Sequence, residues 1–96
     1  MNAIDQKNIE TLERLRAQLL KTEQWPLKYM FKFIVPNTDG RVKSVVETLP
    51  IGGHTTYHPS KDIHYISVTH VNYMHSADDI IATVQRATAV PGVISL

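Results

Sequence analysis

Hydrophobic and polar positions along this 96-residue chain repeat with two different periods, and the order of the periods predicts its secondary structure. Residues 4–22 carry apolar side chains at helical spacing, which indicates an amphipathic helix. From residue 28 to 35 the pattern alternates instead, which is typical of a strand. One face of that strand holds an apolar and largely aromatic set that we expect to meet the helices: Tyr29, Phe31, Phe33 and Val35.

The remainder of the chain continues with two short helices and three strands. Apolar stripes predict one helix over residues 42–49 and another after Ser76, where Ser76-Ala-Asp-Asp79 resembles a capping box. Between the two helices, turn chemistry at Pro59–Asp62 indicates a β-hairpin. The three strands are predicted at Ile51–His58, Ile63–Asn72 and Val93–Leu96.

From Trp25 onward this order is β-α-β-β-α-β, which predicts an α+β, ferredoxin-like sandwich. Right-handed crossovers pass both helices over the same side of the sheet, so we expect a four-stranded antiparallel sheet in the order 4-1-3-2 with two helices on one face. Trp25-Pro26 closes the first segment, because a residue before proline avoids the helical region. We therefore divide the chain into an N-terminal amphipathic helix, residues 1–24, and a ferredoxin-like domain, residues 25–96.

The opposite side of the predicted sheet has no helix of this domain to cover it. The residues predicted to line it and to offer contacts are Lys32, Tyr65, Ser67 and Thr69. Met30 and Ile34 fall on the same side, and apolar groups there favour a cover. We expect that cover to be the N-terminal helix or a second subunit. The helix itself has two possible positions, as a lid on its own domain or with its leucine stripe packed on a second copy.

Composition and charge exclude several classes of protein. The chain has no cysteine, so thiol catalysis and disulfide scaffolds are excluded. Its net charge is +1 and its lysines and arginines are dispersed, so a nucleic acid is not favoured as a partner. No secretory signal and no apolar segment of about 18 residues is visible, so we expect a cytoplasmic protein without membrane contact.

Several stretches together resemble one family, the YbeD-like small bacterial domains of unknown function. These are Tyr29-Met-Phe-Lys-Phe-Ile-Val-Pro36, His58-Pro59-Ser60, Tyr65-Ile-Ser-Val-Thr69, the helix opened by Ser76, and Pro91-Gly-Val-Ile94. The resemblance implies a ferredoxin-like fold similar to the ACT-type regulatory domain of phosphoglycerate dehydrogenase. It also implies a regulatory role, and the family has no established activity and no established catalytic residues. The chain departs from the family's usual Pro-Ser-Ser-Lys-Gly turn, because Pro59-Ser-Lys-Asp-Ile63 has no glycine.

Histidine is the commonest metal ligand, and this chain has five, at positions 54, 58, 64, 70 and 75. His58 and His64 are the candidate metal ligands. With a turn at Pro59–Asp62, however, His58 pairs with Ile63 and His64 with Tyr57, which places the two imidazoles on opposite faces. We therefore predict no metal site and no cofactor, and expect solvated hairpin histidines with His70 partly buried and hydrogen-bonded.

No catalytic constellation is predicted either, because neither Ser60 nor Ser67 has a base held by a third group. The function we predict is therefore that of a non-enzymatic regulatory or protein-interaction domain, which acts as a homodimer or by binding a partner or a small effector. One alternative is an RNA-binding module, for which Tyr65 is the single stacking candidate on the third strand. A histidine metal-binding protein is the other.

Overall fold

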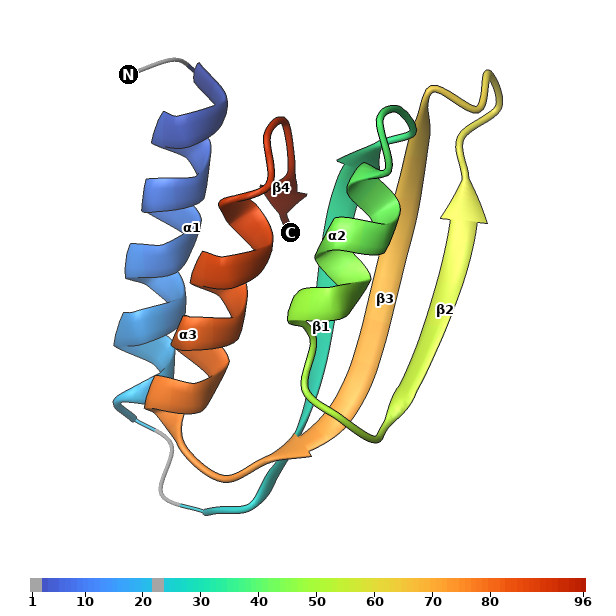
Figure 1. The fold of residues 1–96 in the computed structure, drawn as a ribbon. Helices are drawn as coiled ribbons and strands as arrows, with labels where there is room; N and C mark the ends of the chain where they lie inside the picture. The colour runs from blue at the N-terminus through green and yellow to red at the C-terminus, as the bar shows by residue number, and fades with distance from the viewer. Residues whose placement is uncertain (1–2, 22–23) are drawn as a thin grey trace.

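The computed structural model describes residues 3–21 and 24–96, with side chains from residue 9 onward. It has an α+β architecture with three helices and a four-stranded antiparallel sheet (Figure 1). Its elements are α1 (Ala3–Leu19), β1 (Leu27–Pro36), α2 (Arg41–Thr48), β2 (His54–Pro59), β3 (Tyr65–Met74), α3 (Ala77–Thr88) and β4 (Ile94–Ser95). The strand order is β2-β3-β1-β4, which confirms the predicted order 4-1-3-2 counted from the other edge.

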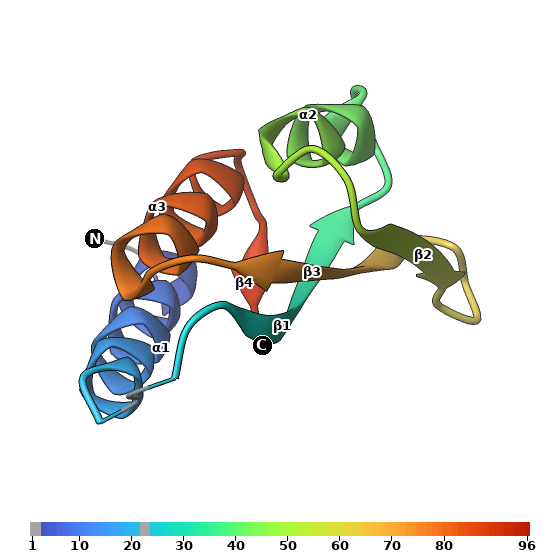
Figure 2. The ribbon, with the colours of Figure 1, turned by 90° about the horizontal axis from the view of Figure 1, so that it is seen from below.

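The core lies between the sheet and helices α2 and α3, which both cover the same side of the sheet (Figure 2). Phe31, Phe33 and Val35 project from β1 into this layer and are fully or almost fully buried. They meet buried side chains of α2 and α3, among them Val45 and Ile80. Burial of one such side chain contributes about 1.5–3 kcal/mol, so the alternation of β1 is a principal source of stability.

Helix α1 lies beside α3 and the short strand β4, on its own domain (Figure 2). Its leucine stripe supplies the contact, since Leu19 is buried and Leu12 and Leu15 pack partly buried against the core. The expectation that this helix covers the uncovered side of the sheet is therefore wrong. An isolated helix of this length is marginal in water, and α3 offers its stripe an apolar surface. The predicted helix end at residue 22 lies outside the described residues.

Strand β2 begins three residues later than predicted, at His54 instead of Ile51. Gly52 and Gly53 explain the difference, because their φ angles of +88° and +74° are incompatible with a strand. Gly53 also approaches β3 closely, and a Cβ atom at this position would overlap the carbonyl oxygen of Val71. The two glycines therefore form the bend that leads into an edge strand.

The β2–β3 turn is longer than predicted, and the predicted pairing of His58 with Ile63 and of His64 with Tyr57 is wrong. Pro59 pairs with Ile66 and His58 with Ser67, which leaves residues 60–64 as the loop. Ile63 causes the difference, because it adopts φ +56°, a left-handed conformation that β-branched residues rarely take. Strand β3 therefore begins at Tyr65 and extends two residues beyond the predicted end, to Met74.

Candidate interaction surface on the uncovered side of the sheet

Within residues 3–21 and 24–96, no helix covers the side of the sheet opposite α2 and α3 (Figure 2). We call this surface the open face. Alternation along each strand sends every second side chain to it, because the intervening residues face the helices. Strand β3 shows this directly, since Val68, His70 and Met74 are buried while Tyr65 and Tyr73 are exposed. The open face comprises Lys28, Met30, Lys32 and Ile34 of β1, Tyr65, Ser67, Thr69, Val71 and Tyr73 of β3, His54, Thr56 and His58 of β2, and Ile94 of β4.

Cross-strand pairing arranges these side chains in rows. Lys32 lies opposite Thr69, which in turn lies opposite Thr56. The neighbouring row runs from Ile34 through Ser67 to His58. All four predicted contact residues lie on the open face: Lys32, Tyr65, Ser67 and Thr69.

Tyr73 and Lys28 are two of the open-face residues that were not among the predicted contacts. Tyr73 fell just beyond the predicted end of its strand, and it pairs with Lys28. Lys28 lies four residues before Lys32 in the same strand, so strand alternation alone could have identified it.

Large apolar and aromatic groups are exposed on this face. Met30 and Tyr73 are each 61% exposed and Tyr65 is 49% exposed, whereas the helix-facing Phe33 is 0% exposed. Ile34 and Val71 are partly exposed between them. A face that mixes exposed apolar groups with polar ones is typical of interaction surfaces.

The charge of the open face has one sign. None of the four strands contains Asp or Glu in its described span. Their only lysines are Lys28 and Lys32, both exposed. The described carboxylates lie on the helices and in loops, so the open face combines positive charge with neutral side chains.

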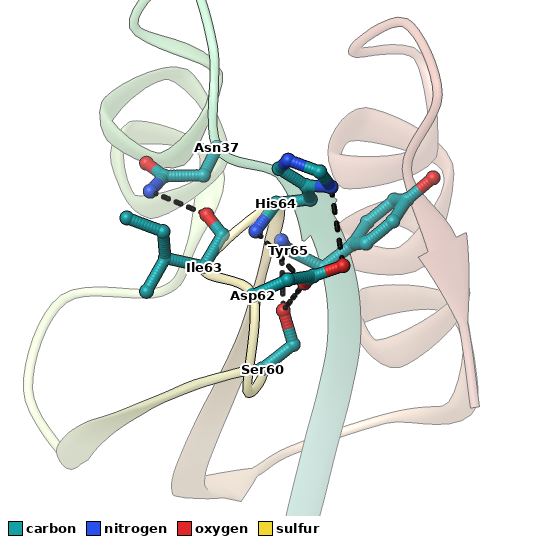
Figure 3. Close-up of polar contacts among 6 residues, drawn as sticks. All are labelled: Asn37, Ser60, Asp62, Ile63, His64 and Tyr65. Carbon is teal, nitrogen blue, oxygen red and sulfur yellow. Dashed lines mark hydrogen bonds and ion pairs between the residues drawn. The ribbon is translucent and has the colours of Figure 1, made fainter.

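The β2–β3 loop lies at the Tyr65 end of this face and is held by a hydrogen-bond network (Figure 3). The Asp62 carboxylate accepts hydrogen bonds from the Ser60 hydroxyl, at 2.8 Å, and from the backbone N–H of His64, at 3.2 Å. Asn37, which follows β1, donates its side-chain amide to the carbonyl of Ile63 at 3.0 Å. The network fixes the loop against the end of β1 and holds Ile63 in its left-handed conformation.

The loop contains Ser60, Asp62 and His64, but the order in which these side chains contact one another is unsuited to nucleophilic catalysis. A serine nucleophile needs its hydroxyl hydrogen-bonded to the histidine, with the carboxylate behind it. Here Asp62 occupies the middle: its carboxylate accepts the Ser60 hydrogen bond and lies 3.1 Å from His64 Nδ1. The hydrogen bond from Ser60 is the main cause that lowers the pKa of Asp62, with the His64 N–H next. The Ser60 hydroxyl is therefore bound to the carboxylate and not to a histidine, and the arrangement stabilises a turn.

The candidate metal ligands His58 and His64 lie in different parts of the hairpin. His58 is on the open face opposite Ser67, whereas His64 is in the loop beside Asp62. Among the described residues, no three histidine or carboxylate side chains come together as a metal site would require.

His70 has a structural role on the helix-facing side of β3. It is 2% exposed, and its Nδ1 lies 2.7 Å from the hydroxyl of Thr55, which joins β3 to the edge strand β2. Burial lowers the pKa of His70, and the nearby Pro50 carbonyl opposes that shift only in part. Among the described residues, Nε2 has no hydrogen-bond partner of good geometry. The neutral imidazole is thus part of the core, consistent with the expectation of a buried, hydrogen-bonded histidine.

Two clefts lie beside the helices, and the first of them is also lined by Tyr73 of the open face. One, of about 340 Å³, lies between α3 and the end of β3 and is bordered by His75, Asp79 and Arg86. Arg86 is engaged there, donating to the Thr48 carbonyl at 3.3 Å. The other cleft separates α1 from the sheet beside Tyr29, and burial raises the pKa of this tyrosine.

No family model, curated protein or solved structure matches the chain. None of the helices in the described residues has the length and apolar run that a bilayer crossing needs. The arrangement of residues on the open face is therefore the observation from which a function has to be argued.

Proposed function

We propose that the chain is a small, non-enzymatic regulatory or protein-interaction domain that binds through the open face. In this proposal the fold is ferredoxin-like, and the chain is a member of the YbeD-like family, similar to ACT-type modules. The domain acts either by pairing with a second copy or by binding another partner, and a small effector adjusts that association.

The observation that carries the proposal is the exposure of Met30, Tyr65 and Tyr73 on a sheet face that α1 leaves uncovered. Covering one large apolar side chain stabilises a complex by up to about 1.5–3 kcal/mol, so a partner that covers these side chains gains affinity. The ten-residue pairing of β1 with β3 holds this surface in a defined shape before any partner arrives. Preorganisation of that kind reduces the entropy cost of association.

A matched pair of tyrosines tests the proposal. Tyr65 and Tyr57 are 49% and 52% exposed, and they lie on opposite sides of the sheet. Tyr65→Ala removes a ring from the open face, whereas Tyr57→Ala removes an equal ring from the helix-facing side. Light scattering at high micromolar concentration distinguishes a homodimer from the 10.9 kDa single chain. Affinity purification from the native cell, followed by mass spectrometry, detects another partner.

We expect an association in the wild type that persists in Tyr57→Ala and is lost or strongly weakened in Tyr65→Ala. Identical behaviour of the two variants would show that the open face is not the binding surface. If all three proteins have the mass of one chain and retain no partner, the proposed function is wrong.

A small effector has a place in the cleft beside Arg86 and Asp79. A thermal-shift screen of amino acids and nucleotides tests for it, because a ligand that binds only the folded state raises the melting temperature. An effector bound in this cleft loses its thermal shift in Arg86→Ala.

A further inference from the structure

We propose that the occupant of the open face is an acidic amphipathic helix of a partner protein. This inference rests on the proposed function and specifies the chemistry of its partner. Three properties of the open face support it: the sign of its charge, the positions of its aromatic rings and the spacing of its side chains.

Charge complementarity gives the first argument. Lys28 and Lys32 are exposed on β1, and neither forms an ion pair within the part of the chain that the structure describes. No carboxylate stands on the described strands to neutralise them. A partner that places carboxylates opposite these lysines gains attraction and faster association.

The same lysines argue against a second copy that uses its own open face. Face-to-face pairing would bring Lys28 and Lys32 of one chain against the same residues of its partner, or against neutral side chains. Like charges brought together at an interface disfavour the complex.

The aromatic rings argue against a nucleic acid. Tyr65 and Tyr73 are eight residues apart on β3, or about 26 Å at about 3.3 Å per residue. The residue midway between them is Thr69, which has no ring on which a base could stack. Recognition of single strands on a sheet of this topology uses aromatic rings that stack two or three bases close together.

Spacing along β1 indicates a helix. Lys28, Met30 and Lys32 alternate positive and apolar groups at intervals of about 6.6 Å, two residues of about 3.3 Å each. An α-helix rises about 1.5 Å per residue, so side chains four residues apart are separated by about 6 Å along its axis. A helix with the pattern Glu-x-x-x-Leu-x-x-x-Glu therefore places two carboxylates near the lysines and a leucine over Met30.

The architecture accommodates such a helix as a third layer. In α/β and α+β domains, helices pack on one face of a sheet or on both faces. Here α2 and α3 cover only one face. About 18 helical residues span about 27 Å, which matches the distance between Tyr65 and Tyr73. The central leucine of this helix would cover Met30 and Val71, which lie opposite each other on β1 and β3.

A synthetic peptide tests the inference directly. The probe is an 18-residue helical peptide with capped ends that repeats glutamate and leucine at the four-residue spacing. The control peptide has lysine in place of each glutamate. We measure binding to the full chain by fluorescence anisotropy, and we expect the acidic peptide to bind and the basic peptide to bind at least tenfold more weakly.

Charge reversal on the protein provides the matched control. Lys28→Glu/Lys32→Glu should weaken binding of the acidic peptide by about tenfold or more, since each exposed ion pair contributes up to about fivefold in affinity and reversal adds repulsion. Lys21→Glu/Lys43→Glu makes the same change of net charge at exposed positions on other surfaces. It should change the affinity by less than about threefold. Binding by the wild type should weaken as salt rises, because salt screens exposed charges.

Several outcomes would overturn the inference. These are no binding of the acidic peptide at millimolar concentration, equal binding of both peptides, or equal losses in the two double variants. Tighter binding of oligouridylate than of the acidic peptide would instead favour RNA. If Tyr65→Ala abolishes an association that Lys28→Glu/Lys32→Glu leaves intact, the proposed function stands and the acidic helix is wrong.

Discussion

Alanine at Gly52 and at Gly53 should have very different effects on stability, although the two glycines are adjacent. Both have left-handed backbones, with φ angles of +88° and +74°. A Cβ atom at Gly52 would have no neighbour within 4 Å, whereas at Gly53 it would overlap the Val71 carbonyl oxygen and lie 2.9 Å from the Asn72 side chain. Comparison of the two variants therefore separates the free-energy cost of the left-handed backbone from the cost of the steric overlap.

The expected free energies follow from these surroundings. A left-handed conformation costs a non-glycine residue about 1–2 kcal/mol, and alanine recovers about 0.4–1 kcal/mol by restricting the unfolded chain. Gly52→Ala should therefore destabilise the fold by about 0.5–1 kcal/mol. Gly53→Ala carries the same backbone cost and also a packing cost of about 1–3 kcal/mol, because the obstructing atom is backbone and cannot rotate away. Its total should be about 2–4 kcal/mol.

Urea unfolding at neutral pH measures both variants. The midpoints should differ while the dependence on urea concentration stays the same, which shows that stability has changed and not the denatured state. By thermal melting the difference should reach about 10 °C, since 1 kcal/mol shifts the melting temperature of a domain of this size by about 4–8 °C. Equal destabilisation by the two substitutions would refute the close approach of β2 to β3 at Gly53.

Three further predictions concern single side chains. Burial lowers the pKa of His70 in the folded state, so as the pH falls the unfolded chain takes up a proton on this histidine before the folded chain does. The free energy of unfolding should therefore be highest above about pH 6.5 and should decrease as the pH drops below that value. His70→Gln should flatten that dependence in melts between pH 5 and 8. Ser76→Ala removes the cap that accepts the Asp79 N–H at 3.1 Å and should cost about 1 kcal/mol in urea unfolding. Ile63→Gly should leave stability unchanged or raise it by up to about 1 kcal/mol, since relief of the left-handed strain offsets glycine's entropy; Ile63→Val, which keeps the strain, should give no gain.

The sequence was sufficient to predict the elements whose periodicity is strong and whose burial follows from it. The alternation of β1 identified the buried side of the strand, because every second residue there is apolar and large. Lys32, Tyr65, Ser67 and Thr69 were placed on the correct side for the same reason. A face assignment depends only on odd and even positions along a strand, so it was unaffected by the error in the ends of β3.

The hairpin could not be predicted in detail, because its register depends on two unusual backbone conformations. Ile63 is a β-branched residue of the kind that favours strands, but it adopts a left-handed conformation. Asp62 stabilises that turn from within the loop, and Asn37 stabilises it from a distant part of the sequence. Gly52 and Gly53 were included in the predicted strand, whereas β2 begins only after them, at His54. The position of α1 also depends on tertiary contacts, since its leucine stripe is compatible with any apolar partner.

Strand pairing is uneven across the sheet, and this has a consequence for its motions. The β1–β3 ladder has ten pairs, whereas β4 contributes two and β2 is an edge strand with six pairs and mostly exposed side chains. Amide protons of β2 should therefore exchange with solvent through local fraying. Those of the β1–β3 pairing should exchange only when the whole domain unfolds. Lys28 and Lys32 lie on β1, and Tyr65 and Tyr73 lie on β3, which are the two strands whose amides exchange slowly. These four side chains therefore keep their relative positions while β2 fluctuates.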